Sequence, residues 1–86
     1  MAVRILELSN GRVSLEFEEK DISAIKMSIF KLFGEAKQKQ FVMASTVEFG
    51  GEDFAFQNEW QDPCLVSDTA LGDKYLRRIY EDLDAK

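Results

Sequence analysis

The chain of 86 residues is 45% hydrophobic and 31% charged, which predicts a single globular domain over 1–86 and excludes a disordered chain. One cysteine excludes an intramolecular disulfide, and the absence of histidine excludes Ser–His and Cys–His nucleophile pairs as well as a tetrahedral zinc site. The net charge of −5 argues against a nucleic-acid partner, because a negative field repels phosphate.

The first ten residues, MAVRILELSN, are typical of the start of a β-strand and not of a signal peptide. Glu7 interrupts the apolar run where the core of a signal peptide would continue. No other run in the chain approaches the length of a transmembrane helix. We therefore expect a cytoplasmic protein that makes no contact with a membrane.

The segment 3–18 predicts a β-hairpin. VRILEL is rich in branched residues, and Asn10-Gly11 is a strong signal for a type I′ turn, in which both central residues need φ > 0. RVSLEFE then alternates, with Val13, Leu15 and Phe17 on one face and polar residues on the other. This alternation predicts a half-buried strand.

The next segment, DISAIKMSIFKLFG, predicts an amphipathic helix. Asp21 is placed to cap its free amide groups, and Gly34 is placed to end it in a left-handed conformation. Met27 and Phe30 lie beside the main apolar stripe. We expect them to broaden the buried face, and the alternative is that they are exposed and meet a partner. The stripe itself consists of Ile22, Ile25, Ile29 and Phe33.

A second, aromatic hairpin follows a polar connector. The connector is AKQKQ (36–40), and FVMASTVEF (41–49) predicts the third strand. Gly50-Gly51 predicts a tight turn, after which EDFAFQNEW (52–60) returns as the fourth strand. By alternation, Trp60 shares a face with the preceding phenylalanines.

The last third of the chain predicts a corner and a second helix. Pro63 is expected to end the fourth strand, and CLV (64–66) is a candidate for a short fifth strand. Ser67 or Asp68 is expected to start the helix, with Asp73 as an alternative cap. Its apolar positions are Leu76, Ile79, Tyr80 and Leu83.

The predicted order is ββαββα. Two hairpins, each followed by a helix, indicate an α+β fold with a four-stranded antiparallel sheet, or a five-stranded one if CLV pairs. Both helices are expected to cover one face of this sheet. The other face should then carry polar side chains toward solvent.

Acidic residues are concentrated in one segment, 40–73, which contains no lysine or arginine. An acidic surface around an exposed tryptophan suits a basic partner, since tryptophan is a common interface anchor. The alternative is that Trp60 continues the aromatic face into the core. We predict a non-enzymatic protein-interaction module that binds a basic surface through Glu52, Asp53, Glu59, Trp60 and Asp62.

In size, acidity and α+β character the chain is similar to small bacterial inhibitor, immunity and antitoxin-like proteins. This resemblance implies a protein partner. It implies no catalytic residue, metal or cofactor.

Two alternatives remain. The first is a homodimer that uses the uncovered face of the sheet or its aromatic strands. The second is a ligand-binding protein or an enzyme that uses Cys64 or a carboxylate pair, either Glu52 with Asp53 or Glu59 with Asp62. The acids on either side of Cys64 in the sequence favour its protonated thiol.

Overall fold

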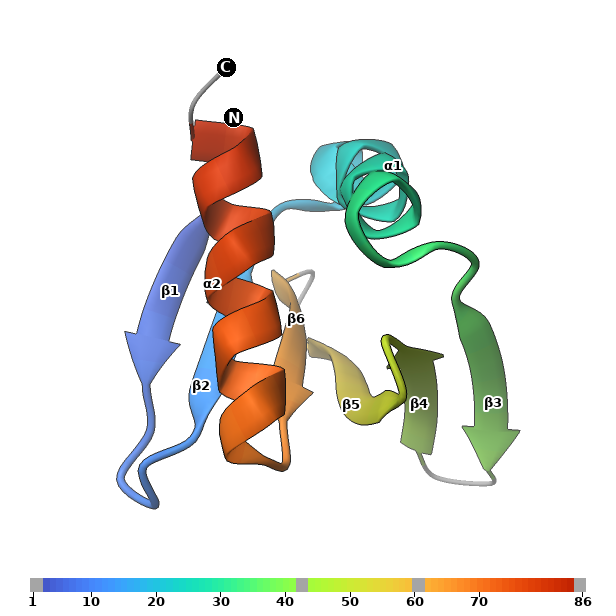
Figure 1. Cartoon of the computed structure of the whole chain (residues 1–86). Helices are drawn as coiled ribbons and strands as arrows, with labels where there is room; N and C mark the ends of the chain where they lie inside the picture. The colour runs from blue at the N-terminus through green and yellow to red at the C-terminus, as the bar shows by residue number, and fades with distance from the viewer. Residues whose placement is uncertain (1–2, 42–43, 60–61, 85–86) are drawn as a thin grey trace.

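The computed structural model describes residues 3–41, 44–59 and 62–84, with side chains for all of these except 39–41, 44, 58, 59 and 62 (Figure 1). Two helices pack on one antiparallel sheet. The elements are β1 (Arg4–Glu7), β2 (Val13–Glu16), the 3₁₀ turn η1 (Glu19–Asp21), α1 (Ile22–Phe33), β3 (Lys37–Phe41), β4 (Ala44–Phe49), β5 (Glu52–Glu59), β6 (Asp62–Ser67) and α2 (Ala70–Asp84).

The α+β class is confirmed, but the predicted strand count and order are wrong. The sheet has six strands in the order β1-β2-β6-β5-β4-β3, and the chain runs ββαββββα. The predicted short fifth strand is the full strand β6, which lies near the centre and joins the first hairpin to the rest. Within the described ranges, no helix combines the length and apolarity that crossing a membrane requires.

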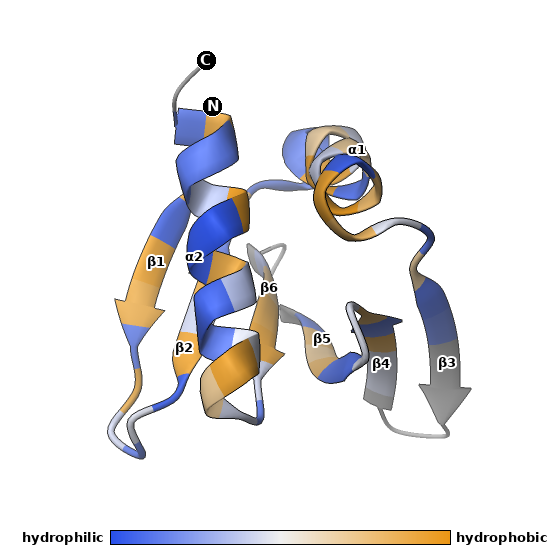
Figure 2. Ribbon diagram, in the orientation of Figure 1, coloured by the Kyte–Doolittle hydropathy of each residue, from blue (hydrophilic) through white to orange (hydrophobic). Residues whose placement is uncertain are grey.

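The segment expected to be a polar connector forms the edge strand β3. Its sequence, KQKQF, has no apolar alternation, and the part drawn in colour in Figure 2 is hydrophilic. It pairs along its whole length with β4, from Lys37↔Glu48 to Phe41↔Ala44. Lysines on an edge strand discourage pairing with other chains, so polarity here is compatible with a strand.

Pro63 does not end a strand as predicted, but is the second residue of β6. It pairs with Asn58 of β5, and its carbonyl oxygen accepts a hydrogen bond from the Phe17 amide at 3.1 Å. A position close to the strand end tolerates the missing N–H of proline.

The first hairpin is confirmed, although its turn is not the predicted type I′ turn. Glu7 pairs with Val13, and the Leu8 amide donates to the Arg12 carbonyl at 2.8 Å, which leaves a three-residue loop. Gly11, at φ +83°, is the last residue of that loop. A three-residue loop needs only its final residue in the left-handed region, and glycine takes that position at little cost.

The core lies between the helices and one face of the sheet. Each helix carries hydrophobic and hydrophilic residues along its length, as a helix with one buried face should (Figure 2). Leu15, Phe54, Leu76 and Ile79 are fully buried. The other buried members of this cluster are Val13, Phe17, Ile25, Ile29, Phe49, Leu65 and Leu83.

The helix ends differ from the predicted ones in one respect. Gly34 does end α1 with a positive φ of +87°, and its amide donates to the Phe30 carbonyl at 3.0 Å. Helix α2 begins after Thr69, not Ser67 or Asp68, because the Thr69 hydroxyl accepts from the Gly72 amide at 2.9 Å. Threonine is a favourable capping residue by this geometry.

Met27 and Phe30 do not broaden the buried face of α1, as we expected. They are 73% and 68% exposed, because Ser28 takes the position between the helices instead. The Ser28 hydroxyl donates to Asp82 of α2 at 2.9 Å, and Lys31 pairs with the same carboxylate at 2.5 Å. Their exposure agrees with the first part of the alternative, and contact with a partner stays a prediction.

Asp21 precedes α1, as predicted, but its side chain makes no capping hydrogen bond. It is buried, and its Oδ2 has no hydrogen-bond partner in the described part of the chain. Because burying a charged oxygen without a hydrogen bond costs more free energy than burying a neutral amide, we expect Asp21→Asn to raise the free energy of unfolding by about 1 kcal/mol. Urea unfolding of both proteins measures this change, and a loss of more than 1 kcal/mol would show that the carboxylate is needed.

Candidate functional site

The face of the sheet opposite the helices is the candidate binding surface. One row of side chains crosses its centre, because Ser14 pairs with Val66, Val66 with Ala55, and Ala55 with Thr46. These side chains are short, and Ser14 among them is buried by its neighbours. The centre of this face is therefore open to a flat partner.

Acidic residues meet at one end of this face. The tight turn at Gly50-Gly51 pairs Glu48 with Asp53, so the two carboxylates stand directly opposite each other on neighbouring strands. Ser67 pairs with Phe54, and Asp68 follows it at the same end of the sheet. We call Glu48, Asp53 and Asp68 the acidic row.

The acidic row borders a lysine of the edge strand on one side. Lys37 of the edge strand lies opposite Glu48 on the side away from Asp53. Asp53 itself is exposed and has no ion pair with a described residue. Like charges directly opposite in a sheet are destabilising, so a cation at this position would relieve the repulsion.

Of the five residues predicted to bind a partner, the structure describes the side chains of Glu52 and Asp53, and it places these two on opposite faces of the sheet. Asp53 is on the uncovered face, whereas the neighbouring Glu52 accepts a hydrogen bond from the Thr69 hydroxyl at the start of α2. Glu59 and Asp62 are paired in the backbone ladder of β5 and β6, and their side chains are not described. Trp60 lies outside the described residues.

One acid of the segment 40–73 has a structural role. The Asp73 carboxylate accepts hydrogen bonds from the Val13 amide at 3.0 Å and from the Ser67 hydroxyl. Arg12 lies 3.6 Å from its other oxygen. Asp73 therefore attaches the first turn of α2 to the sheet and is not part of the binding surface.

Glu48 and Asp68 were not predicted as site residues. Glu48 could have been found from the sequence, because a two-residue Gly50-Gly51 turn places it opposite Asp53. Asp68 could not, because its position depends on β6 lying beside β5.

Cys64 lies half-buried on the uncovered face, between Glu16 and Gln57 in register. Its Sγ is 3.9 Å from Gln57 Oε1. Glu52 and Asp53, one of the two proposed carboxylate pairs, do not converge, because neighbouring residues in a strand point to opposite faces. In the part of the chain with described coordinates, no three His, Cys, Asp or Glu side chains form a group that could hold a metal ion.

The uncovered face of the sheet therefore carries an acidic surface at one end. The exposed Asp53 of that surface has no ion pair with a described residue. No protein-family model, curated protein or solved structure matches this chain.

Proposed function

We propose that the protein is a non-enzymatic interaction module that binds a basic surface of a partner protein through the acidic row. The observation that carries this proposal is the direct opposition of Glu48 and Asp53 across β4 and β5. A ladder that holds two carboxylates side by side produces a fixed negative potential. A basic side chain of a partner would pair with Asp53, which is exposed and has no ion pair with a described residue.

The surrounding sequence supports a basic partner. The segment 40–73 contributes seven acidic residues and no basic one, and the lysine that lies opposite Glu48, Lys37, comes from the edge strand. Desolvation at a flat interface strengthens such pairs relative to exposed ones. The inhibitor, immunity or antitoxin class named above is part of this proposal, since such proteins act by binding a protein.

Reversing the charge of the acidic row is expected to abolish partner binding. A tagged protein carrying Glu48→Lys, Asp53→Lys and Asp68→Lys should capture no partner that the unaltered protein captures at low salt. Capture by the unaltered protein should fall steeply between low and physiological salt, because exposed ion pairs are screened.

The matched control reverses three exposed acids elsewhere, namely Glu19, Glu35 and Glu81. It changes the net charge equally but leaves the acidic row intact, so it should still capture the partner. Capture by the row variant, or equal loss in both variants, would contradict the proposal.

Self-association is the second candidate, because the short residues at the centre of the uncovered face would let two sheets approach closely. Leu6, exposed on β1, extends this central row toward the edge of the sheet. Sedimentation at micromolar concentration distinguishes the two candidates, since only self-association produces a dimer of the purified chain.

A further inference from the structure

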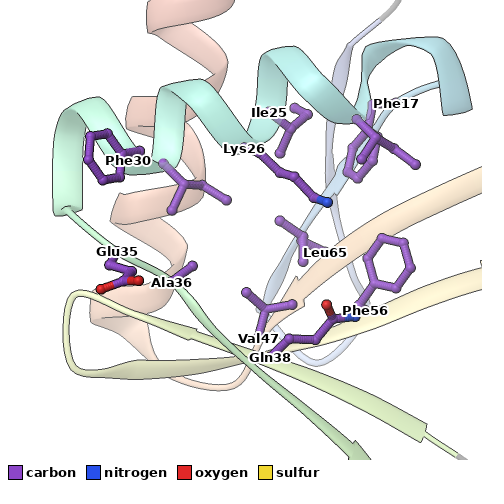
Figure 3. Close-up of a pocket in the computed structure, with 12 residues that line it drawn as sticks. Phe17, Ile25, Lys26, Phe30, Glu35, Ala36, Gln38, Val47, Phe56 and Leu65 are labelled. Atoms are coloured by element: carbon purple, nitrogen blue, oxygen red, sulfur yellow. The ribbon is translucent and has the colours of Figure 1, made fainter.

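A cavity of about 560 Å³ lies between α1 and the covered face of the sheet (Figure 3). Its walls are apolar: Ile25 and Ile29 come from the helix, while Val47, Phe56 and Leu65 come from the sheet. This volume is within the range of small-molecule sites in proteins, about 300–1,000 Å³. The cavity is on the opposite face of the sheet from the acidic row, so it would be a separate site.

The sequence explains why α1 does not fill this space. On the covered face, the central strands carry Phe56 and Leu65, whereas β4 and β3 carry the shorter Ser45 and Val47 and the polar Gln38. Next to the cavity, β4 and β3 therefore carry short or polar side chains, whereas Phe49 of β4 packs against Phe33 at the end of α1. Phe30, which could have filled the gap, lies at the rim and is mostly exposed.

The polar groups of the cavity are arranged by charge. Figure 3 shows Lys26 reaching from α1 toward Leu65 and Phe56, and the amide of Gln38 lies on the floor below. Glu35 lies at the other end, beneath Phe30. Lys26 makes no ion pair or hydrogen bond with a described residue, so its ammonium group is available to an anion.

We propose that this cavity binds a free aliphatic carboxylate, with its head group at Lys26 and its tail along the apolar walls. Charge fixes the orientation, because Glu35 would repel a carboxylate at the opposite end. Burial of the tail against Ile29, Val47 and Leu65 supplies most of the affinity.

The test is a titration of the whole protein with decanoate and with 1-decanol, followed through the NMR signals of the Ile25, Ile29, Val47 and Leu65 methyl groups. Decanoate is expected to shift these signals and to bind about tenfold more tightly than decanol, since it adds a charge-assisted hydrogen bond. Lys26→Met should remove this difference by weakening decanoate alone. Val47→Phe should weaken binding of both by narrowing the cavity.

Lys74→Met is the control, because Lys74 is an exposed lysine of α2 that does not line the cavity. Lys74→Met should leave both affinities unchanged. The variant with the reversed acidic row should also bind both ligands with unchanged affinity, and this result would distinguish the cavity from the surface of the proposed function. The proposal is overturned by an unchanged decanoate affinity in Lys26→Met, by equal affinities for decanoate and decanol, or by the absence of methyl shifts. If the methyl signals shift only under conditions in which the protein sediments as a dimer, a second copy of the chain occupies the cavity. That result would also overturn the proposal.

Discussion

Phe54→Ala is expected to lower the free energy of unfolding by about 3–5 kcal/mol. Phe54 is 0% exposed and stacks on Phe49, with ring centroids 4.1 Å apart and planes 6° apart. Removing the ring therefore leaves a cavity at the junction of β5 and α2 and also breaks an aromatic pair. Since small domains are stable by only about 5–15 kcal/mol, a loss of about 3–5 kcal/mol should remove a fifth or more of the stability of this variant.

Urea unfolding followed by far-ultraviolet circular dichroism measures this loss. Phe30→Ala is the matched control, because it removes the same ring from a position that is 68% exposed. The control should change the free energy of unfolding by no more than about 0.5 kcal/mol. A loss below 1 kcal/mol for Phe54→Ala, or equal losses in the two variants, would refute the described core.

Asp73→Ala is expected to cost about 2–3 kcal/mol and to loosen the attachment of α2 to the sheet. The substitution removes the acceptor of the Ser67 hydroxyl and the nearer acceptor of the Val13 amide, which keeps only the Ser67 hydroxyl oxygen at 3.4 Å. Both residues are buried. It also leaves Arg12 without its partly buried partner. A buried donor that loses its partner costs more than the average net contribution of a hydrogen bond.

Amide hydrogen exchange provides a local readout for this variant. Exchange of the Val13 amide should become faster in Asp73→Ala by more than the change in global stability explains. Glu81→Ala, an exposed acid of the same helix, is the control and should leave the Val13 amide protected. Retained protection in Asp73→Ala would show that the carboxylate does not hold the strand.

Only part of the candidate site could be predicted from the sequence. The sequence shows that acidic residues outnumber basic ones between 40 and 73, but the fold places these acidic residues in different environments. Asp53 is exposed on the uncovered face, Glu52 contacts Thr69, and Asp73 holds α2 to the sheet. Neighbours along a strand point to opposite faces, so two adjacent acids cannot serve one surface.

The cavity under α1 was not predicted for a similar reason. The apolar stripe of α1 predicts that one face of the helix packs against other elements of the fold. It does not predict whether the opposing strands carry large side chains. That depends on β3 and β4 lying under the helix, and the pairing of β3 was not visible in its polar sequence.

The sequence by itself determined the features that depend on local spacing: both helices, the inward faces of β2 and β5, and the tight turn at Gly50-Gly51. Alternation and helical periodicity report which side of an element is buried, and glycine reports where φ must be positive. Only the tertiary structure decided that β6 separates β2 from β5, that β3 forms the edge, and that Glu48, Asp53 and Asp68 share one end of a face. The physical reason is that strand order depends on pairing between distant segments, and local patterns do not encode which segments pair.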